Sequence, residues 1–98
     1  MYYVVFMTTR YNSLADVFAQ APETIASHIA RSKEFHAQGT VLMAGAFLDK
    51  SSEPVSTMAI CTTRQAAEDF ARGDPFVLNG TVSQWQIREW TDLFASPT

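Results

Sequence analysis

Two side chains in this sequence are of the types that move protons in small-molecule sites. His28 lies in the segment ETIASHIARSKEF, and Asp74 lies in the segment ARGDPFVLNG. Histidine titrates near neutral pH, so it can accept a proton and return it. A neighbouring carboxylate selects one tautomer of the ring and favours its charged form. If His28 and Asp74 meet in the fold, they form an acid–base pair.

Both residues also have a purely structural interpretation. In ARGDPFVLNG, Gly73 can close one helix at the C′ position, Asp74 can cap the next helix, and Pro75 suits its first turn. Asn79 and Gly80 then end that short turn. A histidine on the inward face of a helix is commonly a core residue with a hydrogen-bond partner. Which interpretation applies depends on what lies opposite Asp74.

The other reactive side chains do not form a recognisable site. Cys61 is the single cysteine, which excludes an intrachain disulfide and a multi-cysteine zinc site. The two histidines, taken with Asp49 and Asp74, lack the spacing of metal ligands, and the chain has no glycine-rich phosphate loop. We therefore predict neither a bound metal nor a cofactor.

The composition fits a single folded domain over residues 1–98. Hydrophobic residues make up 47% of the chain and charged residues 17%, which suits a packed core and not a disordered segment. The formal net charge of −3 argues against nucleic-acid binding, which needs a basic surface. The apolar start YYVVFM is too short to cross a bilayer and lacks the basic residues of a signal peptide. We therefore expect no membrane association and a cytoplasmic location.

Hydrophobic periodicity divides the chain into alternating strands and helices. The segments with the β-branched and aromatic character of strands are 2–8, 40–48, 54–62 and 81–90. The segments with helical spacing or helical start and stop residues are a short one over 14–20, a long one over 22–38, and one that ends at 72. Without the short segment, the order is βαββαβ, the split βαβ arrangement. We predict an α+β, ferredoxin-like fold in which helices cover one face of a four-stranded antiparallel sheet.

This topology brings His28 and Asp74 to the same edge of the sheet. The first two strands are parallel, so the long helix begins where the first strand ends, and the second helix finishes at that edge. His28 is six residues past Pro22, about 9 Å along the helix axis. Its i+3 spacing from Ile25 places it on the inward face. A contact with Asp74 is compatible with this position, whereas His36 lies about 12 Å further along the axis and cannot share the site.

The first two predicted strands are apolar on both of their faces. The alternating sets are Tyr3, Val5 and Met7 against Tyr2, Val4 and Phe6 in one strand, and Val41, Met43 and Phe47 against Leu42, Ala44 and Leu48 in the other. A sheet with one solvated face should alternate polar and apolar residues, and two helices cannot cover both faces. We therefore expect a homodimer packed sheet against sheet. The alternative is a monomer with an exposed apolar binding face.

Several of these segments together resemble the YCII-related family of small dimeric α/β-barrel proteins. The matching features, in chain order, are His28 in ETIASHIARSKEF, Gly39, the AG of VLMAGAF, Ala67 with Phe70 in QAAEDFARGDPF, and the DPF that contains Asp74. The resemblance spans nearly the whole chain. It implies a ferredoxin-like fold, a dimer that packs sheet to sheet, and an active site centred on a His–Asp pair. His28 takes the place of the family's histidine, and Asp74 takes that of the aspartate in its DP motif.

Two departures from the family bear on the substrate. Many members place Pro after the AG, where this chain has Ala46, and many carry Arg a few residues before the histidine, where it has Glu23 and Thr24. If that Arg binds an anionic substrate, this chain takes a neutral one or does not catalyse, unless Arg10 at the end of the first strand substitutes for it. The residues that we expect to contact a substrate are Arg10, Gly45, Phe47 and Phe76.

The resemblance also implies a class of reaction. One characterised branch of the family removes chloride from a chlorinated hydroxyhydroquinone, and related barrels include muconolactone isomerases. We therefore expect a small enzyme of lyase, isomerase or dehydrochlorinase type that uses His28 and Asp74 on a cyclic or aromatic-derived metabolite. The alternative is a non-catalytic dimeric module that binds a small metabolite or a protein partner, and the sequence alone leaves both open.

Overall fold

A computed structural model describes residues 1–95 of the chain. In chain order its elements are β1 (Tyr2–Thr9), α1 (Leu14–Gln20), α2 (Pro22–Ala37), β2 (Val41–Ala46), β3 (Ser56–Cys61), α3 (Arg64–Gly73), α4 (Pro75–Leu78) and β4 (Val82–Trp90). Every predicted strand and helix is present within a few residues of its predicted ends. None of the helices in this part of the chain is long and apolar enough to cross a lipid bilayer.

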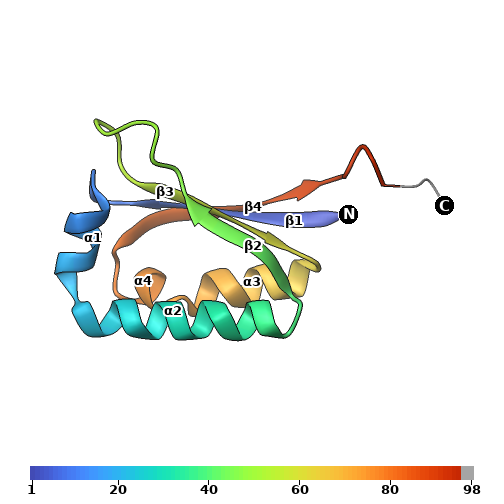
Figure 1. The fold of residues 1–98 in the computed structure, drawn as a ribbon, viewed down its shortest axis with the longest axis horizontal. Coiled ribbons are helices and arrows are strands. Elements are labelled where there is room, and N and C mark those ends of the chain that lie inside the picture. Colours follow the sequence, from blue (N-terminus) through green and yellow to red (C-terminus); the bar gives the residue numbers. More distant parts are fainter. Residues whose placement is uncertain (96–98) are drawn as a thin grey trace.

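The four strands form one sheet in the order β2-β3-β1-β4, and each neighbouring pair is antiparallel. β1 and β2 therefore run in the same direction, as the split βαβ arrangement requires. Figure 1 shows α2, α3 and α4 in one layer beneath the sheet, with α1 at the end where β1 finishes. The predicted α+β, ferredoxin-like fold, with helices on one face of an antiparallel sheet, is confirmed.

Local signals account for the ends of the helices. Ser13 and Thr63 have extended backbones, and their side chains accept a backbone N–H from the first turn of α1 and α3, as N-caps do. Pro22 opens α2 at a position where a missing N–H breaks no helical bond. Gly39 follows α2 and Gly80 follows α4 with φ angles of 79° and 84°, a left-handed backbone that glycine adopts without strain.

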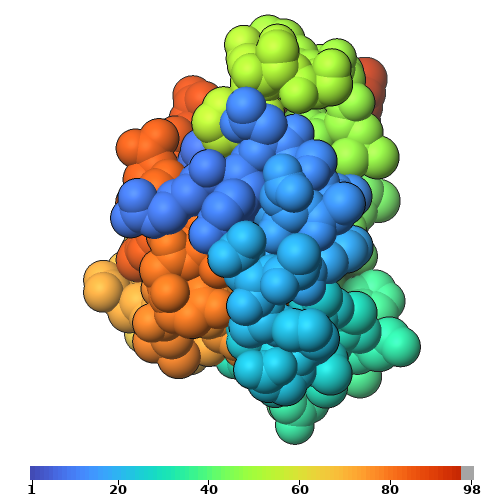
Figure 2. All heavy atoms as spheres, turned by 90° about the vertical axis from the view of Figure 1, so that its left-hand side faces the viewer, coloured from blue at the N-terminus to red at the C-terminus, as the bar shows by residue number. Residues whose placement is uncertain are grey.

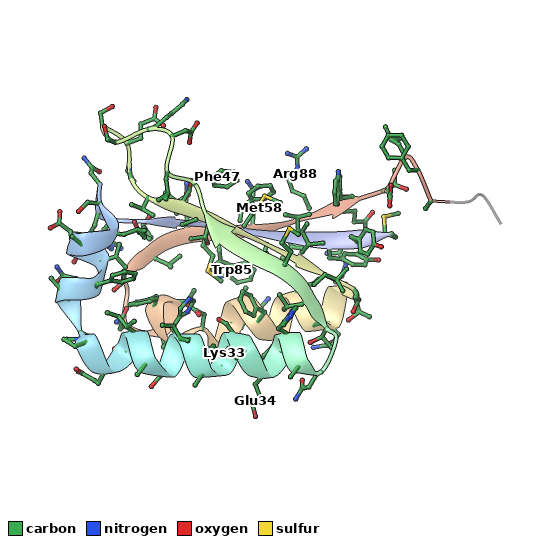
Figure 3. All side chains as sticks on the ribbon, viewed as in Figure 1. Lys33, Glu34, Phe47, Met58, Trp85 and Arg88 are labelled. Atoms are coloured by element: carbon green, nitrogen blue, oxygen red, sulfur yellow. The ribbon has the colours of Figure 1, made fainter. Side chains whose placement is uncertain are left out.

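The core lies between the sheet and the layer of helices. Its buried residues include Val5, Met7, Val41, Ala59, Cys61, Ala67, Phe70, Ala71 and Phe76. Trp85 and Ile87 of β4 pack against this core. Figure 3 shows Trp85 on the helix side of the sheet, with Met58 and Arg88 on the opposite side.

The structure differs from the predicted direction of the side chains in β2. A β-bulge between Val41 and Met43 shifts the register with β3. Because an extra residue reverses the alternation beyond it, Val41 faces the core and is 2% exposed, whereas Met43 is 67% exposed on the other face. The predicted grouping of Val41 with Met43 and Phe47 is therefore wrong.

The face of the sheet opposite the helices, called the open face below, is largely apolar. The strand register places on it Tyr2, Val4, Phe6, Met43, Met58, Ile60, Arg88 and Trp90. In Figure 1 the layer formed by α2, α3 and α4 lies entirely on the other side. A homodimer packed through this face stays a prediction.

Candidate active site

His28 and Asp74 meet where α2 passes the end of α3. His28 lies in the second turn of α2, and Asp74 is the residue between α3 and α4. Nδ1 of His28 is 2.5 Å from Oδ1 of Asp74. An ionised carboxylate only accepts hydrogen bonds, so Nδ1 carries the proton and donates it. The two side chains thus share a short hydrogen bond, and its part in any reaction stays a prediction.

Each carboxylate oxygen of Asp74 has its own donor. Oδ1 accepts from His28, and Oδ2 accepts the backbone N–H of Phe76 at 3.1 Å, which caps α4. Asp74 is only 1% exposed, so water does not supply either bond. The capping interpretation and the pairing interpretation therefore describe two oxygens of one side chain. The cap fixes the direction in which Oδ1 meets the histidine.

Within residues 1–95, one of the two ring nitrogens of His28 has a hydrogen-bond partner and the other has none. Its side chain is 33% exposed, and its centroid lies 5.0 Å from that of Phe76 at an interplanar angle of 48°. With a proton on Nδ1, the neutral ring has its lone pair on Nε2. No group within residues 1–95 hydrogen bonds to Nε2. This nitrogen is available to take a proton from a ligand.

A cavity of about 380 Å³ adjoins the pair. His28 and Asp74 both line it, and most of the remaining walls are apolar, including Met7, Val17, Ile25, Ile29, Ala59, Phe70 and Val82. Its volume falls within the range of small-molecule sites, about 300–1,000 Å³. Figure 2 shows the end of the molecule at which α1 packs against the start of α2, beneath the loop between β2 and β3.

Lys33, an exposed residue of α2, is the one lysine that lines this cavity within residues 1–95. Figure 3 labels Lys33 on α2 and shows Glu34 on the side of this helix that faces away from the sheet. Among residues 1–95 no carboxylate forms an ion pair with Lys33, so its charge is available to a ligand. Lys33 was not among the residues predicted to form the site. Its i+4 spacing from Ile29 was the signal, because that spacing puts both residues on one helical face.

Two of the four residues predicted to contact a substrate line the cavity, namely Gly45 and Phe76. Arg10 does not, because its Nε donates to the carbonyl of Gly80 at 2.8 Å and the side chain is directed to the turn before β4. Phe47 does not either, since it lies on the open face of the sheet (Figure 3). Arg10 and Phe47 are therefore not brought together with the other predicted residues.

The part of the chain that the structure describes contains no cluster of metal ligands. No group of three or more His, Cys, Asp or Glu side chains in residues 1–95 is arranged to hold a metal ion. The second histidine, His36, donates from Nδ1 to the carbonyl of Val41 at 2.9 Å. It therefore joins the end of α2 to β2 and is not part of the His28 site.

Residues 1–91 match the family model of the YCII-related domain. The chain belongs to the YCII-related family. The family resemblance predicted from the motifs around His28 and Asp74 is thereby confirmed. Among curated proteins, none matches the chain.

The fold of this YCII-related chain is similar to that of 5-chloro-2-hydroxyhydroquinone dehydrochlorinase from Burkholderia phenoliruptrix AC1100, solved in complex with 2,5-dihydroxybenzoquinone. The TM-score is 0.66 at 14% sequence identity, over 93% of this chain and 94% of the dehydrochlorinase. At this identity the likeness establishes the fold and not the reaction.

Cys61 is a core residue and does not line the cavity. Burial raises the pKa of its thiol from 9.0 to about 11. The thiolate, not the thiol, is the nucleophile. A cysteine that stays protonated at neutral pH therefore takes no part in the chemistry of this site.

Proposed function

We propose that this protein is a small enzyme of acid–base chemistry, with His28 as the proton acceptor and donor and Asp74 as its orienting partner. One observation carries the proposal: the 2.5 Å hydrogen bond between these side chains forms part of the wall of an apolar cavity of about 380 Å³. A histidine that serves only the fold needs a hydrogen-bond partner, but it does not need a cavity of ligand size beside its ring.

The geometry supports a proton cycle at Nε2 of His28. Asp74 keeps a proton on Nδ1, so the lone pair of Nε2 can remove a proton from a C–H or O–H group of a ligand. The carboxylate then stabilises the imidazolium that forms. If the imidazolium returns the proton to another atom of the ligand, the reaction is an isomerisation. If a leaving group departs with its bonding electrons instead, the reaction is an elimination, and with chloride it is a dehydrochlorination.

The size and walls of the cavity support a cyclic substrate. A volume of about 380 Å³ suits a molecule of one ring with a few substituents, and apolar walls favour such a ring over an extended polar chain. The dehydrochlorinase of similar fold was solved with 2,5-dihydroxybenzoquinone, a one-ring compound. This support is an analogy of fold. The substrate that we propose is a small cyclic or aromatic-derived metabolite.

A homodimer through the open face is also part of the proposal. In the single chain, Met43 is 67% exposed, Phe47 45% and Trp90 49%. Burying one large apolar side chain stabilises an assembly by about 1.5–3 kcal/mol, so a second copy is a favourable cover for this face. We also propose a cytoplasmic location, which rests on the sequence alone.

A non-catalytic module that binds a metabolite is the second candidate. The apolar walls of the cavity favour it, as does the capping bond from Asp74 to α4, because a His–Asp contact at such a place can serve folding alone. The two candidates differ in whether a bound ligand is converted.

A screen for conversion tests the proposal. The purified protein is incubated with chlorinated hydroxyhydroquinones, lactones and related one-ring compounds, and the products are followed by mass spectrometry. His28→Gln is the matched variant, because its amide can still donate to Asp74 but cannot act as a base. We expect the wild type to convert at least one compound and the variant to lose at least ~10²-fold in rate. Binding by both proteins without conversion would support the binding module instead.

A further inference from the structure

Arg31 joins α2 to the end of α3 beside the His28–Asp74 contact. Its Nη1 donates to the carbonyl of Phe70 at 2.9 Å, and its Nη2 donates to the carbonyl of Asp69 at 2.5 Å. The carbonyl of Phe70 is one of the last four of α3, which lack donors within the helix, and the end of a helix carries partial negative charge. The guanidinium from α2 supplies a donor to this carbonyl and a positive charge to the end of α3. Arg31 therefore caps α3 from α2.

Gly73, the last residue of α3, leaves room for this guanidinium. A Cβ at position 73 would lie 2.5 Å from Nη2 and 3.0 Å from Cζ of Arg31. Among residues 1–95 only Gly39 and Gly80 have a positive φ, so the predicted C′ role of Gly73, which needs a left-handed backbone, is wrong. The glycine is required for the space that it leaves and not for its backbone conformation.

Two aromatic rings hold the Arg31 side chain in this direction. Its Cζ lies 4.6 Å from the centroid of Phe35 and 5.9 Å from that of Phe70. The two rings pack edge to face, with their centroids 5.5 Å apart. Stacking on aromatic faces suits a guanidinium, and within residues 1–95 no carboxylate competes for it. The charge of Arg31 is thus directed to the end of α3.

The spacing of these contacts couples them to the candidate active site. Arg31 lies three residues after His28 on α2, and its acceptors lie four and five residues before Asp74. We propose that Arg31, in the space left by Gly73, is a positioning residue that sets the distance between His28 and Asp74. The proposal rests on the proposed function, in which that distance keeps the ring proton on Nδ1. Displacements of about 1 Å between catalytic groups lower rates strongly.

The protonation of the His28 ring, followed by NMR, tests this role without a substrate. Nitrogen shifts report which ring nitrogen carries the proton, and a proton in a short hydrogen bond gives a downfield signal. Arg31→Met removes the donors and keeps an apolar stem, and Gly73→Ala displaces the guanidinium. We expect both variants to stay folded, to lose most of the downfield Nδ1 signal and to show a mixture of ring tautomers.

Arg72→Met is the matched control, because Arg72 also places its guanidinium over an aromatic ring, 5.3 Å from Trp85. It should leave the His28 signals unchanged. The double variant Arg31→Met with Gly73→Ala should lose no more signal than either change alone, since both remove the same contact. Unchanged His28 signals in Arg31→Met, or an equal loss in Arg72→Met, would overturn the proposal.

If Arg31→Met does not fold, Gly73→Ala decides the question, because there only the far end of a flexible side chain must move. His28 signals that match the wild type in that variant would then overturn the positioning role. None of these readouts needs turnover. If the His28 signals change in these variants but the wild type converts no compound in the screen, the proposed function would be contradicted and the positioning role would remain supported.

Discussion

Asp74 holds Nδ1 of His28 at 2.5 Å through one carboxylate oxygen, while its other oxygen accepts the backbone N–H of Phe76 that begins α4. A carboxylate that is 1% exposed is costly to bury unless both oxygens have donors. The cap and the histidine therefore support each other. Because each oxygen has a separate partner, substitutions at position 74 can separate folding from chemistry.

Asp74→Asn should keep the fold and change the histidine. The amide oxygen can still accept the N–H of Phe76, and Asn caps about as well as Asp. The amide NH₂ then faces Nδ1 of His28 and donates to it, which moves the ring proton to Nε2. We expect the free energy of unfolding to fall by less than about 1 kcal/mol.

Asp74→Ala loses both hydrogen bonds. We expect its free energy of unfolding to be about 1–3 kcal/mol lower than that of Asp74→Asn, because buried groups are left without partners. Urea denaturation of the two variants measures the difference. Equal stability of Asp74→Asn and Asp74→Ala would show that neither bond matters to the fold.

The fold followed from the sequence because its signals are local. Strand composition, helical spacing and end residues such as Pro22, Thr63 and Gly39 each act within a few residues of the element they define. The bulge after Val41 has no such signal, since it depends on how β2 pairs with β3. The alternation of residues therefore could not predict the direction of the side chains in β2, including that of Phe47.

The parts of the site that depend on the order of the elements could be predicted from the sequence. The parts that depend on the direction of single side chains could not. His28 and Asp74 come together because the element order brings the start of α2 and the end of α3 to one edge. Arg10 lies near that edge too, but its side chain is directed to Gly80. The residues next to Gly73 in the sequence could not predict that it leaves space for a guanidinium, because Arg31 comes from another helix.

Lys33 should favour anionic ligands in the cavity. Lys33 is one of the residues that line the cavity, and it has no ion-pair partner within residues 1–95. We expect Lys33→Met to weaken the binding of benzoate by roughly 2- to 5-fold, which corresponds to about 0.5–1 kcal/mol. The binding of neutral benzamide should not change, as calorimetry can show. Lys50→Met is the control, since Lys50 pairs with Glu53. An equal effect on benzoate and benzamide would exclude a role for the charge.

Cys61 should make the fold sensitive to alkaline pH. The pKa of its thiol is raised from 9.0 to about 11 in the folded chain, so the folded thiol keeps its proton where the unfolded thiol loses it. Its contribution to stability is therefore fully present below about pH 9 and is lost as the pH rises through about 11. The free energy of unfolding of the wild type should fall more steeply over this interval than that of Cys61→Ala. If the free energies of unfolding of the two proteins fall equally with pH, the Cys61 thiol is not the cause of the alkaline sensitivity.

A charge on the open face should separate the proposed homodimer. The wild type should sediment as a dimer at micromolar concentration, with an interface on the order of 1,200–2,000 Å². Phe6→Glu places a carboxylate on the open face and should give a monomer. Leu78→Glu, at a residue of α4 that is 73% exposed, should remain a dimer. A wild type that sediments as a monomer at this concentration would exclude the dimer.

His28 and Asp74 should act as one unit in turnover. Once the screen has identified a substrate, kcat/KM is compared among the wild type, His28→Gln, Asp74→Asn and the double variant. Each single variant should lose at least ~10²-fold, the low end of what acid–base catalysis contributes. The double variant should lose little more, because groups that act together are not additive.

The most direct test of His28–Asp74 catalysis is the kcat/KM of Asp74→Asn alone. This variant keeps the cap of α4 and removes the charge that orients and stabilises a protonated His28. A fall of at least ~10²-fold in a folded protein is the predicted result. A kcat/KM equal to that of the wild type would contradict it, and Asp74 would then be a helix cap that happens to touch a histidine.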